Sequence, residues 1–300
     1  MAEARTQAVE TFGLEARPGV QRWVRQFSRW PLVSLLIISV MVICAVFAPL
    51  LAPPDPTSGA LTDRNIPPAW YPNGSLDHLL GTDALGRDVL SRIIYGSRIS
   101  LMVAAIVLSC GAIGGTIFGL VSGWFGGVVD EIAQRFVEFT LAIPFILVAL
   151  VVVIVLGQST VVVVALLVVF SWNGFSRLVR GQALQLKGMD YVKLAKIAGA
   201  GTPRILFHHI LPGVSNTVFV LISLRVGSLI LTESVLSYLG VGIPPPTPAW
   251  GLMVAEGKEY VTTAWWITLF PGVAIFLVVL AFNFLGDWLQ DRLDPRLRQM

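Results

Sequence analysis

Six long apolar stretches constrain this chain more than any other feature of its sequence. A helix that crosses the ~30 Å hydrocarbon core of a bilayer needs about 20 mostly apolar residues, because each residue adds about 1.5 Å. The stretches of this kind lie at residues 31–52, 99–124, 136–156, 160–175, 213–231 and 264–285. The sequence therefore predicts an all-α integral membrane protein with six transmembrane helices.

The composition agrees with a chain that lies mostly in the bilayer. Hydrophobic residues make up 55% and charged residues 13%, whereas soluble domains carry about 25% charged residues. The excess is spread over the whole length, which excludes a soluble enzyme with a single anchor. Both cysteines, Cys44 and Cys110, lie inside apolar stretches, so no disulfide framework or cysteine zinc site is expected. A net charge of +3 is too small to indicate a nucleic-acid partner.

The basic residues predict the orientation of the chain in the membrane. With six spans, both termini share one side, and that side carries 15 Lys and Arg residues against five on the other. Because Lys and Arg accumulate on the cytoplasmic side, both termini are predicted to be cytoplasmic. The chain then divides into a leader (1–30), a transmembrane domain (31–286) with outer loops at 53–98 and 232–263, and a tail (287–300).

The leader carries an apolar stripe at helical spacing, with its arginines elsewhere. This pattern predicts an amphipathic helix that lies in the membrane interface. The alternative is a disordered tail in which the spacing arises by chance. The residues of the stripe are Val20, Trp23, Val24, Phe27 and Trp30.

Glycines recur at every fourth position through the second apolar stretch. They line one helical face and remove the side chains from it, so that another helix can pack closely there. The facing helix belongs either to this chain or to a partner subunit. The glycines are Gly111, Gly115, Gly119, Gly123 and Gly127.

The loop at 176–212 is long for a connection between two spans, and long ordered loops tend to be functional. Its centre has the periodicity of a short helix, because four apolar residues recur on one face, opposite two lysines. Such an exposed helix suits docking into a groove of another protein. The apolar residues are Tyr191, Leu194, Ala195 and Ala198, and the lysines are Lys193 and Lys196.

A second short helix is expected directly after the first. Gly199 and Gly201 end the first helix and form a hinge. Thr202 is predicted as the N-cap of the second helix and Pro203 as part of its first turn. The second helix is expected to end before the Leu-Pro-Gly sequence at 211–213.

At this loop the chain resembles the EAA signature of bacterial ABC-importer permeases, in which Glu-Ala-Ala is followed by Gly, nine residues and Ile-x-Leu-Pro. Gly199 and the pair Leu211 and Pro212 have the spacing of the signature. Lys193 and Leu194 replace the Glu and the first Ala, and Ala195 keeps the second Ala. His209 stands in the position of the Ile.

Three further segments resemble the second, C-type permease subunit of the dipeptide, oligopeptide and nickel importers. They read HLLGTDALGRDVLSR at 78–92, LSYLG to PPPTPAWG at 236–251, and FNFLGD to DPR at 282–296. The resemblance covers the chain from about residue 30 to its end. It implies the type I ABC-importer permease fold, in the cytoplasmic membrane of a bacterium or archaeon.

The resemblance also implies how the protein works. The loop would be a coupling helix seated in a cleft of an ATPase subunit, whose closure on ATP rocks the spans between inward-facing and outward-facing states. This chain lacks the G-x-x-x-x-G-K-[ST] loop that cradles phosphates, so ATP and Mg²⁺ are expected on partner subunits and no catalysis on this chain. The implied coupling residues are Tyr191, Lys193, Leu194, Ala195, Ala198, Gly199, Thr202, Pro203, Leu211 and Pro212.

The implied partners are a homologous B-type permease, two ATPase subunits and an extracytoplasmic peptide-binding protein. Dipeptides or oligopeptides are the expected cargo, and nickel chelates, glutathione or oligosaccharides are the alternatives within the same machinery. A secondary transporter would need coupling-ion sites among the spans, for which the sequence offers few carboxylates. An intramembrane enzyme has no supporting His, Cys or paired-Asp pattern.

Two ionisable residues are candidates for the translocation path, because a charge inside a span is costly and tends to be functional. Arg225 either faces the pathway and meets a substrate carboxylate, or pairs with a buried acid. Glu233 is such an acid, but eight residues correspond to about 12 Å of helix, so a direct pair in a straight span is not expected.

Overall fold

The computed structural model describes residues 31–52 and 55–293. The predicted leader helix and the end of the predicted tail lie outside these residues. Within them all named elements are helical, and one isolated β-bridge joins Thr82 and Asp88. The prediction of an all-α architecture is therefore confirmed for the described residues.

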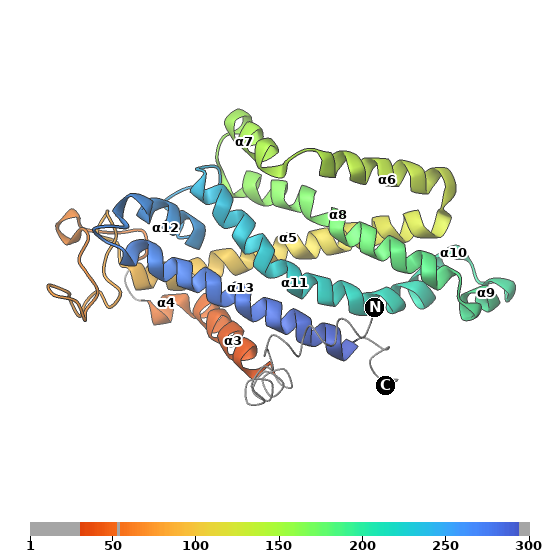
Figure 1. The fold of residues 1–300 in the computed structure, drawn as a ribbon, viewed down its shortest axis with the longest axis horizontal. Coiled ribbons are helices and arrows are strands. Elements are labelled where there is room, and N and C mark those ends of the chain that lie inside the picture. Colours follow the sequence, from red (N-terminus) through yellow and green to blue (C-terminus); the bar gives the residue numbers. More distant parts are fainter. Residues whose placement is uncertain (1–30, 53–54, 294–300) are drawn as a thin grey trace, which may run out of the picture.

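Four long helices run along the long axis of the molecule (Figure 1). In chain order, the second of these helices packs along most of the length of the first, and the third helix contacts both the first and the fourth. Their shared interior holds the main hydrophobic core. The four helices are α5 (Val89–Phe125), α8 (Thr160–Lys187), α11 (Leu211–Tyr238) and α13 (Trp266–Leu293).

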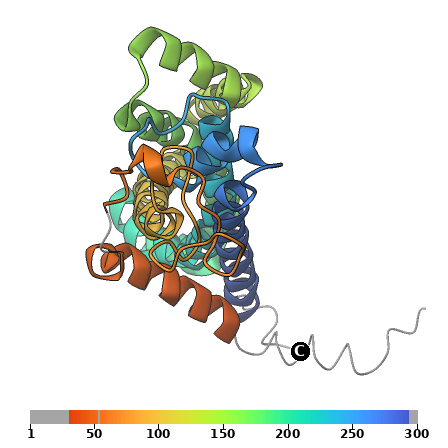
Figure 2. The ribbon, with the colours of Figure 1, turned by 90° about the vertical axis from the view of Figure 1, so that its left-hand side faces the viewer.

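Shorter helices cover two opposite sides of these four, as the end-on view shows (Figure 2). On one side lie α3 (Leu32–Val46) and α4 (Ala48–Leu51), and on the other lie α6 (Gly127–Ala142) and α7 (Phe145–Leu156). The two ends of the bundle are capped separately (Figure 1). One end carries η1 (Leu61–Asp63), α12 (Trp250–Gly257) and η3 (Lys258–Tyr260), and the other carries α9 (Asp190–Ile197) and α10 (Thr202–Ile205).

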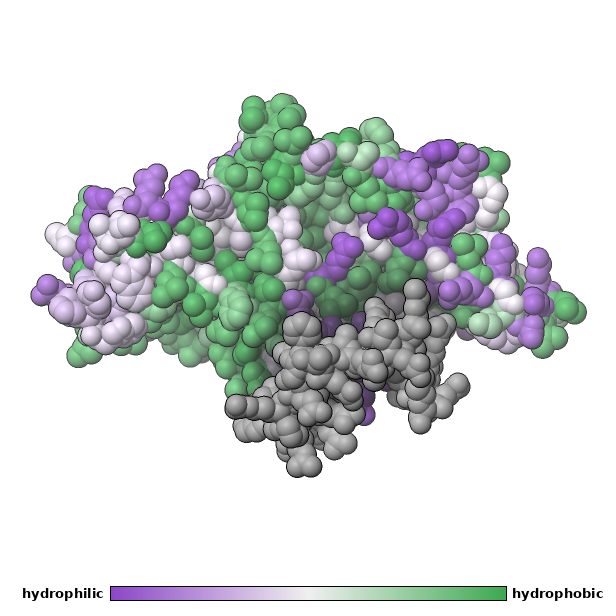
Figure 3. Space-filling model, in the orientation of Figure 1, coloured by the Kyte–Doolittle hydropathy of each residue, from purple (hydrophilic) through white to green (hydrophobic). Residues whose placement is uncertain are grey.

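Apolar side chains form a broad region across the middle of the molecule, and hydrophilic side chains gather at both ends (Figure 3). Within the described residues, four helices are individually long and apolar enough to cross a membrane, and a fifth span results if the bent pair α6 and α7 is counted as one. The first apolar stretch forms the 15-residue helix α3 and the separate short α4. The structure thus supports a multi-pass protein with four or five candidate spans, and six remains a prediction.

The sequence predicted a single helix for the apolar stretch at 136–156, but this stretch is not one straight helix. It is divided between α6 and α7, which meet at an angle of 77°. Ile143 is extended, with φ −93° and ψ 122°, and Pro144 follows it. Proline has no amide hydrogen to donate and disfavours the helical conformation of the preceding residue, so the helix ends here.

Most helices extend beyond the apolar stretches that predicted them. The fourth stretch ends at residue 175, yet α8 continues to Lys187, so the predicted loop at 176–212 begins with about three helical turns. The helix α5 begins ten residues before its stretch, where the Asp88 carboxylate caps the helix by accepting from the Ser91 amide at 2.7 Å. The differences arise because hydropathy marks the apolar part of a helix, whereas caps and breaks mark its ends.

Candidate functional site

The helix predicted in the long loop is confirmed as α9, which projects from one end of the bundle (Figure 1). Tyr191, Leu194 and Ile197 are exposed, by 46%, 64% and 82%. Val192 is 2% exposed and attaches the helix to a small apolar cluster. The remaining members of that cluster are Leu120, Trp124, Val179, Ala183, Ile205, Ile210 and Val214. The helix therefore has one anchored face and one apolar face that no other part of the described residues covers.

Two of these residues are not among those that the sequence pattern singled out. Ile197 extends the exposed apolar face, and Val192 provides the anchor. Both are apolar residues inside the predicted helix, but helical spacing alone does not show which side of a short helix meets the bundle. Lys193 Nζ donates to Asp190 Oδ1 at 3.2 Å within the same helix, and both side chains are exposed. Such a surface pair stabilises little.

Gly199 forms the turn after α9. Its φ is +83°, in the left-handed region that favours glycine. Its amide donates to the Lys196 carbonyl at 3.1 Å, and the Ala200 amide donates to the Ala195 carbonyl at 3.0 Å. The predicted role of Gly199 in the bend thus has a structural basis, because these bonds require the left-handed residue at this position.

The second short helix differs from the prediction at both ends. Gly201 is the N-cap of α10, and Thr202 is its first residue, with no side-chain cap. The helix also does not end before Leu211. It continues through the π-helical turn η2 (Leu206–Ile210) into α11, as a single helical segment over 202–238.

The π turn explains how the chain passes the proline without a break. The Leu211 amide donates to the Leu206 carbonyl, five residues back. Pro212 lies just after this π turn, as one of the first two residues of α11. The α9–α10 turn is therefore joined to α11 through continuous helix.

Polar contacts hold the neighbouring helix ends together. Arg180 on α8 makes a bidentate ion pair with Asp130 on α6, with both N–O distances 2.6 Å. Asp130 Oδ1 also accepts from Ser122 Oγ at 2.5 Å. Lys187 Nζ donates to the Trp124 carbonyl, which joins the end of α8 to the end of α5. The α9 end of the bundle is therefore braced as a unit.

The glycine face of α5 packs on α8 of the same chain. A Cβ atom added to Gly111, Gly115, Gly119 or Gly123 would lie 2.0 to 2.9 Å from an α8 atom. Gly127 differs from this set: it begins α6, has a φ of +53°, and no atom lies within 4 Å of an added Cβ. The four-residue spacing fails there because α5 ends at Phe125 and the chain turns.

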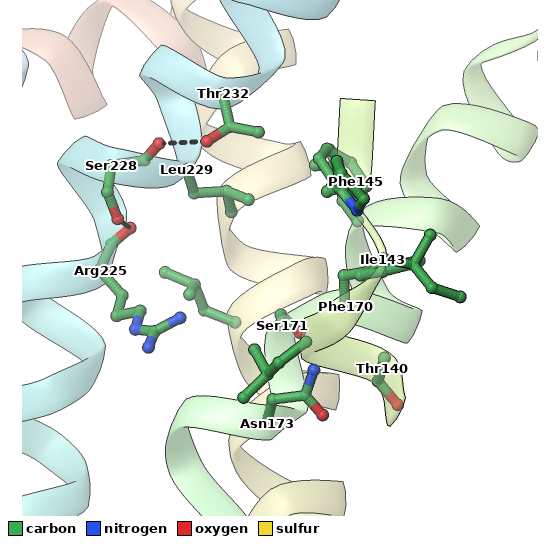
Figure 4. A pocket seen from close by; sticks show the side chains of 14 residues that line it. Thr140, Ile143, Phe145, Phe170, Ser171, Asn173, Arg225, Ser228, Leu229 and Thr232 are labelled. Atoms are coloured by element: carbon green, nitrogen blue, oxygen red, sulfur yellow. Dashed lines mark hydrogen bonds between the residues drawn. The ribbon is translucent and has the colours of Figure 1, made fainter. Parts of the chain in front are cut away.

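The two candidates for the translocation path lie in different surroundings on α11. Glu233 is 2% exposed, accepts from Ser237 Oγ at 2.7 Å, and has no hydrogen-bond partner for Oε2 within the described chain. It lies beside Ser100 and Val103 of α5. Arg225 is half-buried and lines a different cavity (Figure 4). As expected from their spacing, the two do not pair.

The Arg225 cavity lies where α5, α8 and α11 meet the bend between α6 and α7. Its volume is about 320 Å³. Pro144 belongs to its wall, so the broken helix contributes to the shape of the site. The other lining residues are Leu108, Thr140, Leu141, Ile143, Phe145, Leu167, Phe170, Ser171, Asn173, Arg225, Ser228, Leu229 and Thr232.

A cluster of ion pairs, which the sequence analysis did not predict, lies at the opposite end from α9. Arg92 is fully buried, and its Nη1 donates to Asp83 at 2.5 Å and to Glu256 at 2.8 Å. Arg87 donates to the same two acids at 2.7 and 2.9 Å. The cluster ties the segment before α5 to α12. The segment at 78–92 contains the charged residues of this cluster, but their partner Glu256 is distant in sequence, so the sequence alone does not indicate the ion pairs.

Together, the helical bundle and its sequence motifs define a family. The chain belongs to the binding-protein-dependent transport system inner membrane components, whose family model matches residues 115–299. A second model, the N-terminal TM domain of oligopeptide transport permease C, matches residues 21–68. The chain is thus a membrane component of a transport system, and the resemblance noted in the sequence is confirmed.

Several relatives are similar over most of their length. The dipeptide transport system permease protein DppC of Haemophilus influenzae is 41% identical over 272 residues, which cover 91% of this chain and 92% of that protein. The protein of the same name from Escherichia coli is 42% identical and covers 89% of both. The glutathione transport system permease protein GsiD of Pectobacterium atrosepticum is 41% identical, over 88% of this chain and 86% of that protein.

A solved structure supports the fold independently. The crystal structure of an amino acid ABC transporter with histidines aligns with a TM-score of 0.53. The alignment covers 68% of this chain and 95% of that chain, at 13% identity. At this identity the likeness concerns the fold alone.

Proposed function

We propose that this chain is a permease subunit of an ATP-driven importer and forms half of a translocation pathway for dipeptides or oligopeptides. The names of the relatives support the peptide cargo, and the relative named for glutathione transport indicates a close alternative. Nickel chelates and oligosaccharides are more distant alternatives. The other half of the pathway would be a homologous B-type permease.

The observation that carries the proposal is the exposed apolar face of α9. Three large apolar side chains stand free of the bundle, while Val192 holds the helix in place. An exposed apolar face on an anchored short helix is suited to a groove on another protein. In the proposed complex that groove belongs to an ATPase subunit, which binds ATP and Mg²⁺.

The helix connections suggest how the motion is transmitted. Since α10, η2 and α11 are continuous, a shift of the α9–α10 turn acts on the helix that carries Arg225. Since Val192 belongs to the same apolar cluster as residues of α5 and α8, the same shift would act on the braced α5–α8 pair. Two rigid elements that move against each other are what a two-state transport cycle requires.

The proposed arrangement in the membrane follows the basic residues. It has six spans, with α3 and α4 as the first and the bent pair as the third, and both termini in the cytoplasm. The α9 end then faces the ATPases. The end with the buried ion cluster faces an extracytoplasmic peptide-binding protein. The membrane is the cytoplasmic membrane of a bacterium, in keeping with the sources of the relatives.

Reconstitution tests this function directly. The chain, its B-type partner and the two ATPases are placed in liposomes with the peptide-loaded binding protein outside and ATP inside. Peptide accumulation that requires ATP hydrolysis supports the proposal. Accumulation by the isolated chain under an ion gradient without nucleotide would instead establish a secondary transporter.

A charged substitution at the turn after α9 tests the coupling role. Gly199→Asp puts a side chain on a residue with φ +83°, which costs about 1–3 kcal/mol locally, and places a negative charge beside the docking face. We expect the protein to insert normally but to lose ATPase co-purification and transport.

Gly240→Asp is the matched control for this test. Gly240 has a φ of +80°, lies in open space like Gly199, and follows α11 at the opposite end of the molecule. It should therefore carry the same backbone strain but retain its ATPases. Normal ATPase binding and transport by Gly199→Asp would contradict the coupling assignment.

A further inference from the structure

The otherwise largely apolar wall of the cavity includes two polar side chains, Asn173 and Arg225, for which no side-chain hydrogen bond is found within the described residues. Its volume of about 320 Å³ falls at the lower end of the about 300–1,000 Å³ range of small-molecule sites. Phe145 and Ile143 lie on the side opposite Arg225 (Figure 4). A cavity of this kind at the depth of the bundle core suits a small, partly apolar ligand.

Most hydroxyl groups of the wall already have acceptors in the chain. Ser228 donates to the Arg225 carbonyl at 3.0 Å and Thr232 to the Ser228 carbonyl at 2.8 Å. Ser171 and Thr140 also donate to backbone carbonyls. These hydroxyls are therefore committed to helix backbone, and the donors left for a ligand come from other residues.

Asn173 is the first of these donors. It is 3% exposed, and neither Nδ2 nor Oδ1 has a hydrogen-bond partner within the described residues. A buried amide without a partner costs about 1–3 kcal/mol, so such a group calls for an explanation, and a bound ligand is one. Asn173 contributes to the cavity wall from α8, but both of its polar atoms are buried in this structure, so its side chain must turn for Nδ2 to reach a ligand.

Arg225 is the second residue with donors left for a ligand. Its guanidinium occupies the space that a side chain on Gly174 would fill, since an added Cβ there would lie 1.9 Å from Arg225 Nη2. It also lies over the Phe175 ring at 5.9 Å. No acid in the part of the chain that the structure describes forms an ion pair with it.

We propose that this cavity binds the α-carboxylate of a passing peptide, with the Arg225 guanidinium as the cation and Asn173 Nδ2 as a neutral donor. The inference rests on the proposed function. A guanidinium is planar and presents parallel donors that match a carboxylate. Every peptide carries an α-carboxylate whatever its side chains are, so one arginine serves varied cargo, and the apolar wall accepts the variable part.

A single arginine and one amide would also bind a peptide with the moderate affinity that transport requires. A site on a pathway must hold its substrate well enough to accept it and weakly enough to release it. Two donors without an enclosing set of further charges meet both conditions. The site would favour peptides over amines or neutral solutes of similar size.

The test uses the complete transporter in liposomes with its binding protein and ATP, and two probes, dialanine and dilysine. Both carry the α-carboxylate, but they differ in net charge. The variants are Arg225→Gln, Arg225→Lys and Asn173→Leu. Arg177→Gln is the control, because it removes a nearby arginine that does not line the cavity.

Losing a hydrogen bond to a charged group generally costs a factor of about ten or more. We therefore expect Arg225→Gln to lower the initial uptake rate of both probes by about tenfold or more, with subunit co-purification unchanged. Arg225→Lys and Asn173→Leu should show smaller losses, and Arg177→Gln should stay within about twofold of the wild type.

Three results would overturn the carboxylate site. One is unchanged uptake by Arg225→Gln. Another is faster dilysine uptake with unchanged dialanine uptake, which would show a general electrostatic barrier. The third is dissociation of the complex in Arg225→Gln together with transport at the wild-type rate by Asn173→Leu. That combination would show that Arg225 forms a structural ion pair with a partner subunit. If the wild-type complex imports neither probe, the proposed peptide function fails instead.

Discussion

The contact between α5 and α8 allows one prediction to be worked out from distances. A Cβ atom on Gly115 would lie 2.4 Å from the Trp172 carbonyl oxygen and 2.6 Å from Phe175 Cβ. Ordinary contact begins near 3.4 Å, so Gly115→Ala must separate the helices locally by about 1 Å. The carbonyl belongs to a helix backbone and cannot rotate away.

The expected change in the stability of Gly115→Ala follows from two opposing effects. Overpacking of this kind costs about 1–3 kcal/mol, and a gap that opens beside it loses further dispersion contacts. Replacing a helical glycine by alanine gains about 1 kcal/mol. Gly114 is the matched control, since it lies on the same helix and an added Cβ meets nothing within 4 Å. The stability of Gly115→Ala should therefore fall about 1–3 kcal/mol below that of Gly114→Ala.

Thermal inactivation of the purified transporter in detergent measures this difference. The fraction that remains monodisperse after heating is compared for wild type, Gly114→Ala and Gly115→Ala at one protein concentration. For a chain of this size each 1 kcal/mol corresponds to roughly 2–4 °C in midpoint. Equal midpoints for the two variants would show that α5 and α8 do not pack as closely as the structure indicates.

Two further predictions concern the cavity and the ion cluster. Gly174→Ala should displace the guanidinium of Arg225, a flexible group that can move. Peptide uptake should then fall severalfold, while the thermal midpoint stays close to that of the wild type. Normal uptake would contradict the position of this guanidinium beside Gly174. Arg92→Met should lower stability by about 3 kcal/mol, since breaking a buried pair costs about 3–5 kcal/mol and Asp83 and Glu256 keep Arg87 as a partner. An unchanged midpoint for this variant would refute the burial of the cluster.

The sequence by itself determined the class of protein and much of its local structure. Long apolar stretches leave few alternatives to membrane helices, because backbone groups in lipid must be satisfied within the helix. The position of α9 and the need for glycine at 199 also followed from local patterns. Helical periodicity and backbone conformation depend on neighbours a few residues apart, so a single sequence contains them.

Only the tertiary structure decided which residues meet. The partner of the glycine face is α8, the third apolar stretch bends at Pro144, and the π turn carries the chain past Pro212. The Arg225 cavity likewise needs three helices, α5, α8 and α11, and the bend between α6 and α7 together. Contacts between distant segments depend on how whole helices pack, and periodicity along one helix does not specify the surface that it meets.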